Sequence, residues 1–358
     1  MTVVSNSTPW SPSRRTRNPE DVSTAWQIDA YKFDLPMLAA PMDSVVSPET
    51  AIEIGRLGGL GVLNLEGLWT RYDDPRIPLG EIASMPDKHA TRRMQEIYSA
   101  PIRPELIKER IQMIRDAGVT VAASLSPQRT AELHKAVIAA GVDIFVIRGT
   151  TVSAEHVASE REELNLKKFI YELDVPVIVG GVATATGALH LMRAGAAGVL
   201  VGFGGGAAHT TRKVLGIEVP MASAVAEVAA ARREYLDESG GRYVHVIADG
   251  AVGRSGDIAK AIAMGADAVM MGSPLAKATQ APGLGWHWGS EAHHGQLPRG
   301  ERVNVGTVGS LEEILLGPSH SADGSMNLFG ALRRSMATCG YSDVKSFQRV
   351  EVLISHGK

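Results

Sequence analysis

The chain has 358 residues, of which 44% are hydrophobic and 21% are charged, and its formal net charge is −3. This is enough apolar material for one large core, and the basic excess typical of a nucleic-acid binder is absent, so we expect no nucleic-acid partner. The chain has one cysteine, Cys339, which excludes an internal disulfide and a cysteine-rich metal site and favours a reducing compartment. Residues 1–17 lack the apolar segment of a secretory signal, and no stretch approaches the roughly 20 apolar residues that span a bilayer. We therefore expect a cytoplasmic protein with no membrane partner.

Short apolar segments alternate with amphipathic ones along the chain. The apolar segments are rich in Val, Ile or Leu, and most end in Gly, Ser or Asp, as expected for parallel strands buried on both faces. They are residues 35–42, 59–65, 120–126, 142–149, 175–181, 197–204, 243–250 and 267–273. Eight strands alternating with helices predict an α/β fold, a single parallel (β/α)8 TIM barrel. An open doubly wound sheet is the alternative, although it would more often begin with a GxGxxG turn, which is missing here.

Three segments lie outside this alternation. We expect residues 1–34 to form an N-terminal extension and residues 326–358 to form closing helices. Residues 280–325 contain the stretch GLGWHWGSEAHHGQLPRG, which has no periodicity and is interpreted as a loop or flap over the barrel mouth. All three belong to one domain spanning residues 1–358.

The segments after the seventh and eighth strands carry the clearest signal for a ligand. Asp249 ends the seventh strand, where its carboxylate can accept two ribose hydroxyls, and Gly250 allows close backbone approach. Residues 255–257 open a helix whose free N–H groups would attract an anion, and Gly272 and Ser273 offer further N–H groups after the eighth strand. Phosphate sites after strands seven and eight recur in this architecture. The alternative is that both are ordinary turns that cap helices.

Two further strand ends face the same mouth. Residues 202–212 contain four glycines within five positions, followed by His209, and either expose backbone groups to a ligand or cation or form a flexible connection. Met42, after the first strand, could lie against a flat base, or it is a core residue next to a helix cap. The histidines lack a metal-ligand spacing with carboxylates, so we predict no structural zinc.

Taken together, these segments resemble the IMP dehydrogenase/GMP reductase family. The matching stretches are LAAPMDSVVSPETAIEIGRLGGLGVLN, VIVGGVATATGALHLMRAGAAGVLVGFGGG, IADGAVGRSGDIAKAIAMGADAVMMGSPLA and NLFGALRRSMATCG. The short connection after the second strand resembles the branch that lacks the paired regulatory (CBS) domains. The resemblance implies a homotetramer that binds a purine mononucleotide (IMP, XMP or GMP) beside NAD, with NADP the less favoured cofactor.

The resemblance also implies roles for individual residues. The ribose carboxylate falls on Asp249, and the base-contacting methionine falls on Met42. Phosphate contacts fall on Gly250, Ala251, Gly272 and Ser273. Carbonyls of Gly204, Gly206 and His209 would hold a monovalent cation such as K+, and His209 and Thr211 would take the catalytic positions. The position of a strand-four carboxylate associated with the cofactor ribose is occupied by Arg148.

The departures from the family pattern decide which activity to expect. The family's chemistry needs a thiolate at the position of His209, and an asparagine after strand five is replaced by Gly181. Losing a covalent nucleophile commonly costs about four to six orders of magnitude in rate. The first hypothesis is therefore an IMP dehydrogenase of GMP biosynthesis with altered or impaired turnover. The second is a nucleotide-binding pseudoenzyme or regulator, and the third is GMP reductase, whose chemistry needs the same cysteine.

Overall fold

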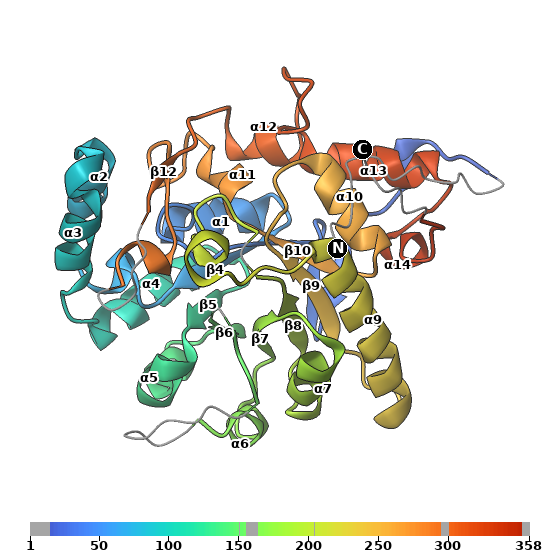
Figure 1. The fold of residues 1–358 in the computed structure, drawn as a ribbon, viewed down its shortest axis with the longest axis horizontal. Coiled ribbons are helices and arrows are strands. Elements are labelled where there is room, and N and C mark those ends of the chain that lie inside the picture. Colours follow the sequence, from blue (N-terminus) through green and yellow to red (C-terminus); the bar gives the residue numbers. More distant parts are fainter. Residues whose placement is uncertain (1–14, 150, 155–163, 204, 295–300, 353–358) are drawn as a thin grey trace.

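The computed structural model describes residues 15–149, 151–154, 164–203, 205–294 and 301–352. Eight parallel strands close into a barrel in the order β10-β3-β4-β5-β6-β7-β8-β9, with helices packed around it (Figure 1). The predicted (β/α)8 barrel is confirmed, and the doubly wound sheet is excluded because β10 pairs with both β9 and β3. The barrel strands are β3 (Met37–Ala39), β4 (Leu60–Asn64), β5 (Ala122–Leu125), β6 (Ile144–Arg148), β7 (Val177–Val182), β8 (Gly198–Val201), β9 (His245–Asp249) and β10 (Ala268–Met271).

Each predicted strand segment coincides with one barrel strand, although β7 runs one residue past its segment to Val182, and nearly all the strand residues are buried. The larger surrounding helices are α1 (Pro48–Arg56), α2 (Arg76–Ser84), α3 (Asp87–Tyr98), α4 (Pro104–Asp116), α5 (Pro127–Ala139), α6 (Leu166–Tyr171), α7 (Ala185–Arg193), α9 (Met221–Glu238), α10 (Ser255–Ala263) and α13 (Leu328–Thr338). Short helices are α8 (Thr211–Leu215), α11 (Ser273–Ala276), α12 (Leu311–Leu315) and α14 (Val344–Phe347). No helix in these described ranges is long and apolar enough to cross a membrane.

The helix α1 shows how local sequence and packing agree. Ser47 caps its first turn by accepting the N–H of Thr50 at 3.1 Å, and Pro48 occupies the first helical position. The helix then packs on β4 so closely that a Cβ at Gly61 would lie 2.6 Å from the α-carbon of Ala51. Only glycine allows that approach.

The two ends of the described chain meet beside α13. A hairpin of β1 (Trp26–Ile28) and β2 (Tyr31–Phe33), which the sequence did not predict, buries Trp26. The N–H of Arg17 donates to the carbonyl of Ala337 at 2.9 Å, and the N–H of Ser23 donates to that of Ser342 at 2.8 Å. We call these contacts the terminal clasp.

The described residues of the predicted mouth loop or flap include a short β-hairpin pairing. In it, β11 (Trp286–His287) pairs antiparallel with β12 (Val303–Asn304). Trp288 is 1% exposed, so this segment is anchored into the core. We call residues 283–294 and 301–306 the roof hairpin.

Candidate functional site

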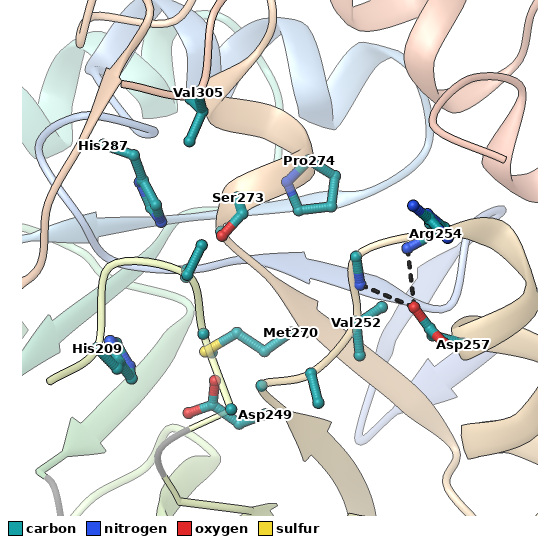
Figure 2. Close-up of a pocket in the computed structure, with 18 of the residues that line it drawn as sticks. His209, Asp249, Val252, Arg254, Asp257, Met270, Ser273, Pro274, His287 and Val305 are labelled. Atoms are coloured by element: carbon teal, nitrogen blue, oxygen red, sulfur yellow. Dashed lines mark hydrogen bonds between the residues drawn. The ribbon is translucent and has the colours of Figure 1, made fainter. Parts of the chain in front are cut away.

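A cavity of 1250 Å³ lies at the carboxyl ends of the barrel strands. Nine of the residues predicted from the sequence line it (Figure 2): Met42, Arg148, Gly206, His209, Asp249, Gly250, Ala251, Gly272 and Ser273. Thr211 is instead buried at the first position of α8 and is not among the lining residues. Gly204 lies outside the described residues. The barrel therefore brings most of the predicted set to one place.

Asp249 and Arg148 form an ion pair across the floor of the cavity. The Arg148 Nε–H donates to Asp249 Oδ2 at 3.0 Å, and the two side chains are 19% and 11% exposed. Burial by itself lowers the pKa of Arg148, but the carboxylate of Asp249 outweighs burial, and the pKa is raised above its usual value. Arg148, which was predicted to contact the cofactor, therefore contacts Asp249, which was predicted to bind the nucleotide ribose. A guanidinium only donates hydrogen bonds, so Arg148 cannot accept one from a hydroxyl.

Close backbone packing explains the glycines after β8. A Cβ at Gly205 would lie 2.8 Å from the Ala251 nitrogen, and one at Gly202 would lie 2.3 Å from the Asp249 carbonyl oxygen. Gly250 and Ala251 both adopt left-handed conformations, with φ of 105° and 56°. Such a φ costs an alanine about 1–2 kcal/mol, so the surrounding packing has to hold this turn. At Gly202 and Gly205 the loop is packed against the β9 turn, which a merely flexible connection would not explain.

The N-terminus of α10 is less open to an anion than the sequence predicts. The N–H groups of Gly253 and Arg254 donate to Asp257 Oδ2 at 3.2 and 3.0 Å (Figure 2), and the N–H of Ser255 donates to the carbonyl of Gly324 at 2.9 Å. These three donors are therefore already satisfied within the protein. Within the predicted residues 255–257, the N–H of Asp257 is also bonded, to the carbonyl of Arg254 at 3.0 Å, so this helix start offers fewer free donors than expected.

The turn after β10 keeps its donors available. Within the described part of the chain, the N–H groups of Gly272 and Ser273 have no acceptor, while the Gly272 carbonyl accepts the N–H groups of Leu275 and Ala276 at 3.0 Å. Two adjacent free N–H groups at a strand end suit an anion. The Gly272–Ser273 turn is the better candidate for a phosphate.

The charges around the cavity also favour an anionic ligand. Three carboxylates are already paired, with Asp249 bonded to Arg148, Glu218 to Arg212 and Asp257 to Lys260. Six cationic side chains face four carboxylates; they are Arg148, Arg212, Lys213, Arg254, Lys260 and Lys277 against Glu218, Asp249, Asp257 and Asp323. Because the whole chain carries a charge of −3, this excess is local. A local excess of this sign raises the concentration of anions at the site.

The roof hairpin is held down by a buried polar chain. The Trp288 Nε1–H donates to the Tyr98 hydroxyl at 2.9 Å, and that hydroxyl donates to Asp43 Oδ2 at 2.6 Å. Burial raises the pKa of Asp43 above its usual value, although the bonds from Tyr98 and the Leu68 N–H lower it. These hydrogen bonds could not be predicted from the sequence, because Trp288 and Tyr98 lie 190 residues apart.

His287 and His209 face the cavity from the roof and from the loop after β8 (Figure 2). His287 is 2% exposed, and its Nδ1 lies 3.0 Å from the Ser44 hydroxyl. Burial, with a further effect of His209, lowers the pKa of His287 to about 3. A Cβ at Gly289 would lie 3.7 Å from His209 Cε1 and 3.2 Å from Met42 Cε. Met42 and His209 therefore meet the roof at the same point.

The thiol of Cys339 is separate from this site. It follows α13, is 3% exposed and is not among the residues that line the cavity. Burial raises its pKa, which keeps it protonated. Because the chain has only this cysteine, no thiolate is available to the cavity.

The cation predicted beside His209 is not tested by the described residues. The Gly206 carbonyl accepts the N–H of His209 at 3.1 Å, which uses one of its lone pairs. Gly204 is outside the described ranges, so the predicted set of three carbonyls is incomplete there. Among the side chains that the structure describes, no three His, Cys, Asp or Glu residues gather as metal ligands would.

Comparisons with known proteins agree over most of the chain. The family model for the IMP dehydrogenase / GMP reductase domain matches residues 10–291. A solved IMP dehydrogenase/GMP reductase-like protein from Corynebacterium glutamicum is 51% identical, with a TM-score of 0.91 over 97% of this chain and 93% of that one. An uncharacterized oxidoreductase from Mycolicibacterium smegmatis is 55% identical over 96% of this chain and 94% of its own length. An inosine-5′-monophosphate dehydrogenase from Methanocaldococcus jannaschii is 27% identical over 92% of this chain and 88% of its own length.

Proposed function

Because the chain belongs to the IMP dehydrogenase / GMP reductase family of oxidoreductases, we propose that it binds a purine nucleoside 5′-monophosphate and oxidises IMP to XMP with NAD. One observation carries the proposal: Asp249, the Gly272–Ser273 turn and Met42 meet in a single cavity from three strand ends. A carboxylate, paired N–H donors and a soft side chain match a ribose diol, a phosphate and a flat base.

The binding mode follows from these three groups. The ribose hydroxyls donate to Asp249, whose oxygens keep lone pairs beyond those bonded to Arg148. The phosphate accepts from the N–H groups of Gly272 and Ser273, next to the Gly250–Ala251 turn. The purine ring stacks on Met42. In this position the edge of the purine that carries carbon 2 faces His209.

His209 acts in this proposal as a base rather than as a nucleophile. An imidazole bonded to purine carbon 2 would be a cation that forms only by displacing hydride. A neutral imidazole can instead take a proton from water while the water oxygen bonds to carbon 2. The overall reaction balances as IMP, water and NAD+ giving XMP, NADH and a proton.

The cavity leaves room for a cofactor beside the nucleotide. Its 1250 Å³ exceeds the roughly 300–1,000 Å³ of a pocket for one small ligand. When bound, a nicotinamide ring supplies the acceptor for the hydride. Arg148 fits such a cofactor by donating to an oxygen, such as a phosphate or carboxamide oxygen, and cannot accept the protons of a ribose diol as a carboxylate would. NAD, with NADP as the alternative, is therefore proposed without a carboxylate contact at this position.

Binding without turnover is the second candidate function. It is favoured by His209, since imidazole replaces the thiolate and Cys339 is buried elsewhere. In this form the protein would be a nucleotide sensor or a partner of an active relative. GMP reductase ranks third because it needs the same thiolate.

Three measurements separate these functions. Calorimetry with IMP, XMP and GMP tests binding, and failure to bind any of them refutes the first two functions together. NADH absorbance with IMP, NAD+ and K+ tests turnover, and NADPH oxidation with GMP tests the reductase. The His209→Cys variant then tests the rest of the site. A wild type without turnover and a variant with turnover support the second candidate, whereas NADH formation by the wild type supports the first.

The proposed homotetramer is tested by sedimentation with and without nucleotide.

A further inference from the structure

His287 presents one ring edge to the turn that offers the free N–H groups. A Cβ at Gly272 would lie 3.4 Å from His287 Cε1 and 3.5 Å from Nε2. The imidazole therefore lies next to the turn, at a distance where a side chain on residue 272 would just touch it. An anion bound to the N–H groups of Gly272 and Ser273 lies beside Nε2.

Ser44 decides which nitrogen of His287 is free to bind a ligand. Its hydroxyl lies 3.0 Å from His287 Nδ1 and accepts the Trp288 N–H at 3.3 Å. Nδ1 is thus occupied, while Nε2 has no partner in the ranges that the structure describes. The hydroxyl proton can go to Nδ1 or to the Trp288 carbonyl oxygen at 3.3 Å, and when it goes to Nδ1 the neutral ring carries its proton on Nε2. An anion at the turn selects this tautomer, because Nε2–H then donates to it.

The His287 ring is buried, and few polar groups near it could bind it in place of a ligand. His287 is 2% exposed, and burial together with His209 keeps its pKa far below neutrality, so the free protein holds it uncharged. Its other close neighbours, Ser44, Met42 and Gly272, carry no charge. His287 lines the cavity, so a ligand there can reach Nε2 and supply the acceptor that the described residues do not.

We propose that His287 is a specificity residue that binds the 5′-phosphate of the nucleotide, delivered to the β10 turn by the roof hairpin. The inference rests on the proposed nucleotide site and adds a side-chain donor to its two backbone donors. It also explains why the roof is anchored: the phosphate contact requires Ser44 to hold the ring at Nδ1, which leaves Nε2 facing the turn. A hydrogen bond to a charged group contributes about 1.5–3 kcal/mol, which corresponds to about a tenfold to 100-fold change in affinity.

The test compares a nucleotide with its nucleoside. Dissociation constants of IMP and inosine are measured by calorimetry for the wild type, His287→Ala, His287→Gln and Ser44→Ala. His287→Ala should weaken IMP by about tenfold to 100-fold and leave inosine unchanged. His287→Gln should recover much of the loss, since its amide N–H reaches the position of Nε2. The loss of IMP affinity in Ser44→Ala should lie between the losses in His287→Ala and His287→Gln. The matched control is His89→Ala, an exposed histidine on α3.

The outcomes distinguish this inference from the proposed function. If the wild type binds IMP and His287→Ala binds it equally well, the phosphate role is wrong and the nucleotide site stands. An equal loss for IMP and inosine also overturns the role, because it indicates collapse of the roof; circular dichroism and urea midpoints identify that case. If the wild type binds no purine nucleotide, the proposed function fails, and this inference fails with it.

Discussion

Replacing His245 by phenylalanine should make the fold less sensitive to acid. His245 begins β9 beneath the barrel, packed edge-on against Trp26 and Tyr243 at 5.7 and 5.1 Å between ring centroids. Burial lowers its pKa to about 4, with the Asp267 carboxylate opposing the shift and Lys345 reinforcing it. Its buried Nδ1 has no hydrogen-bond partner among the described residues. Phenylalanine therefore keeps the aromatic packing and loses no hydrogen bond.

The magnitude follows from the two pKa values. The unfolded histidine titrates near 6.5 and the folded one near 4, so the neutral side chain's contribution is complete above 6.5 and declines as pH falls toward 4. At pH 5 the unfolded chain binds a proton that the fold excludes, which costs about 2 kcal/mol relative to pH 7. His287 and His293, with pKa values lowered to about 3 mainly by burial, act in the same direction.

Urea unfolding at pH 7 and pH 5 measures this difference. Between the two pH values the wild type should lose about 2 kcal/mol more unfolding free energy than His245→Phe. The control is His89→Phe on the exposed face of α3, which should follow the wild type. Equal losses for the wild type and His245→Phe would show that His245 is not held neutral in the fold.

Two substitutions probe the cavity itself. Gly289→Ala places a Cβ 2.8 Å from Glu291 Oε2 and 3.2 Å from Met42 Cε, so the roof has to shift; we expect about a tenfold loss of IMP affinity by calorimetry, and unchanged affinity would contradict this packing. Arg148→Met leaves Asp249 without its cation and should lower the unfolding free energy by about 2–3 kcal/mol. That is less than the roughly 3–5 kcal/mol of a fully buried pair, because both side chains border the cavity. Adding Asp249→Asn should restore part of the loss in urea denaturation, and a double variant no more stable than Arg148→Met would refute the coupling.

The barrel could be predicted from the sequence because its strands are buried on both faces. A segment such as β7, with all six residues buried, has to be apolar throughout, and that pattern is visible without a structure. The hairpin of β1 and β2 was missed because three-residue strands are too short to show alternation. Its turn also lacks a glycine: Asp29 itself takes the left-handed conformation, with φ of 52°.

The site could be predicted where it depends on strand ends and not where it depends on contacts across the barrel. Asp249 and Gly272 follow neighbouring strands, so their proximity follows from topology. The bond between Arg148 and Asp249 joins strands separated by two others, and only the barrel's width decides it. The contact of His287 with Ser44 spans 243 residues and was equally hidden. One missed signal was readable: Asp257 at the third position of α10 is a capping residue that competes with a ligand for the same N–H groups.

The terminal clasp sets the order in which the molecule can be completed during synthesis. Arg17 Nε–H also donates to the carbonyl of Gly340 at 3.0 Å, across 323 residues of chain. At about 5–20 residues per second, the ribosome takes roughly 15–65 s to make that intervening length. Over that interval the segment around Arg17 has no partner, and apolar surface that the C-terminal helices later cover stays exposed to chaperones. A nascent chain halted after β10 would contain all eight barrel strands and still lack the terminal clasp.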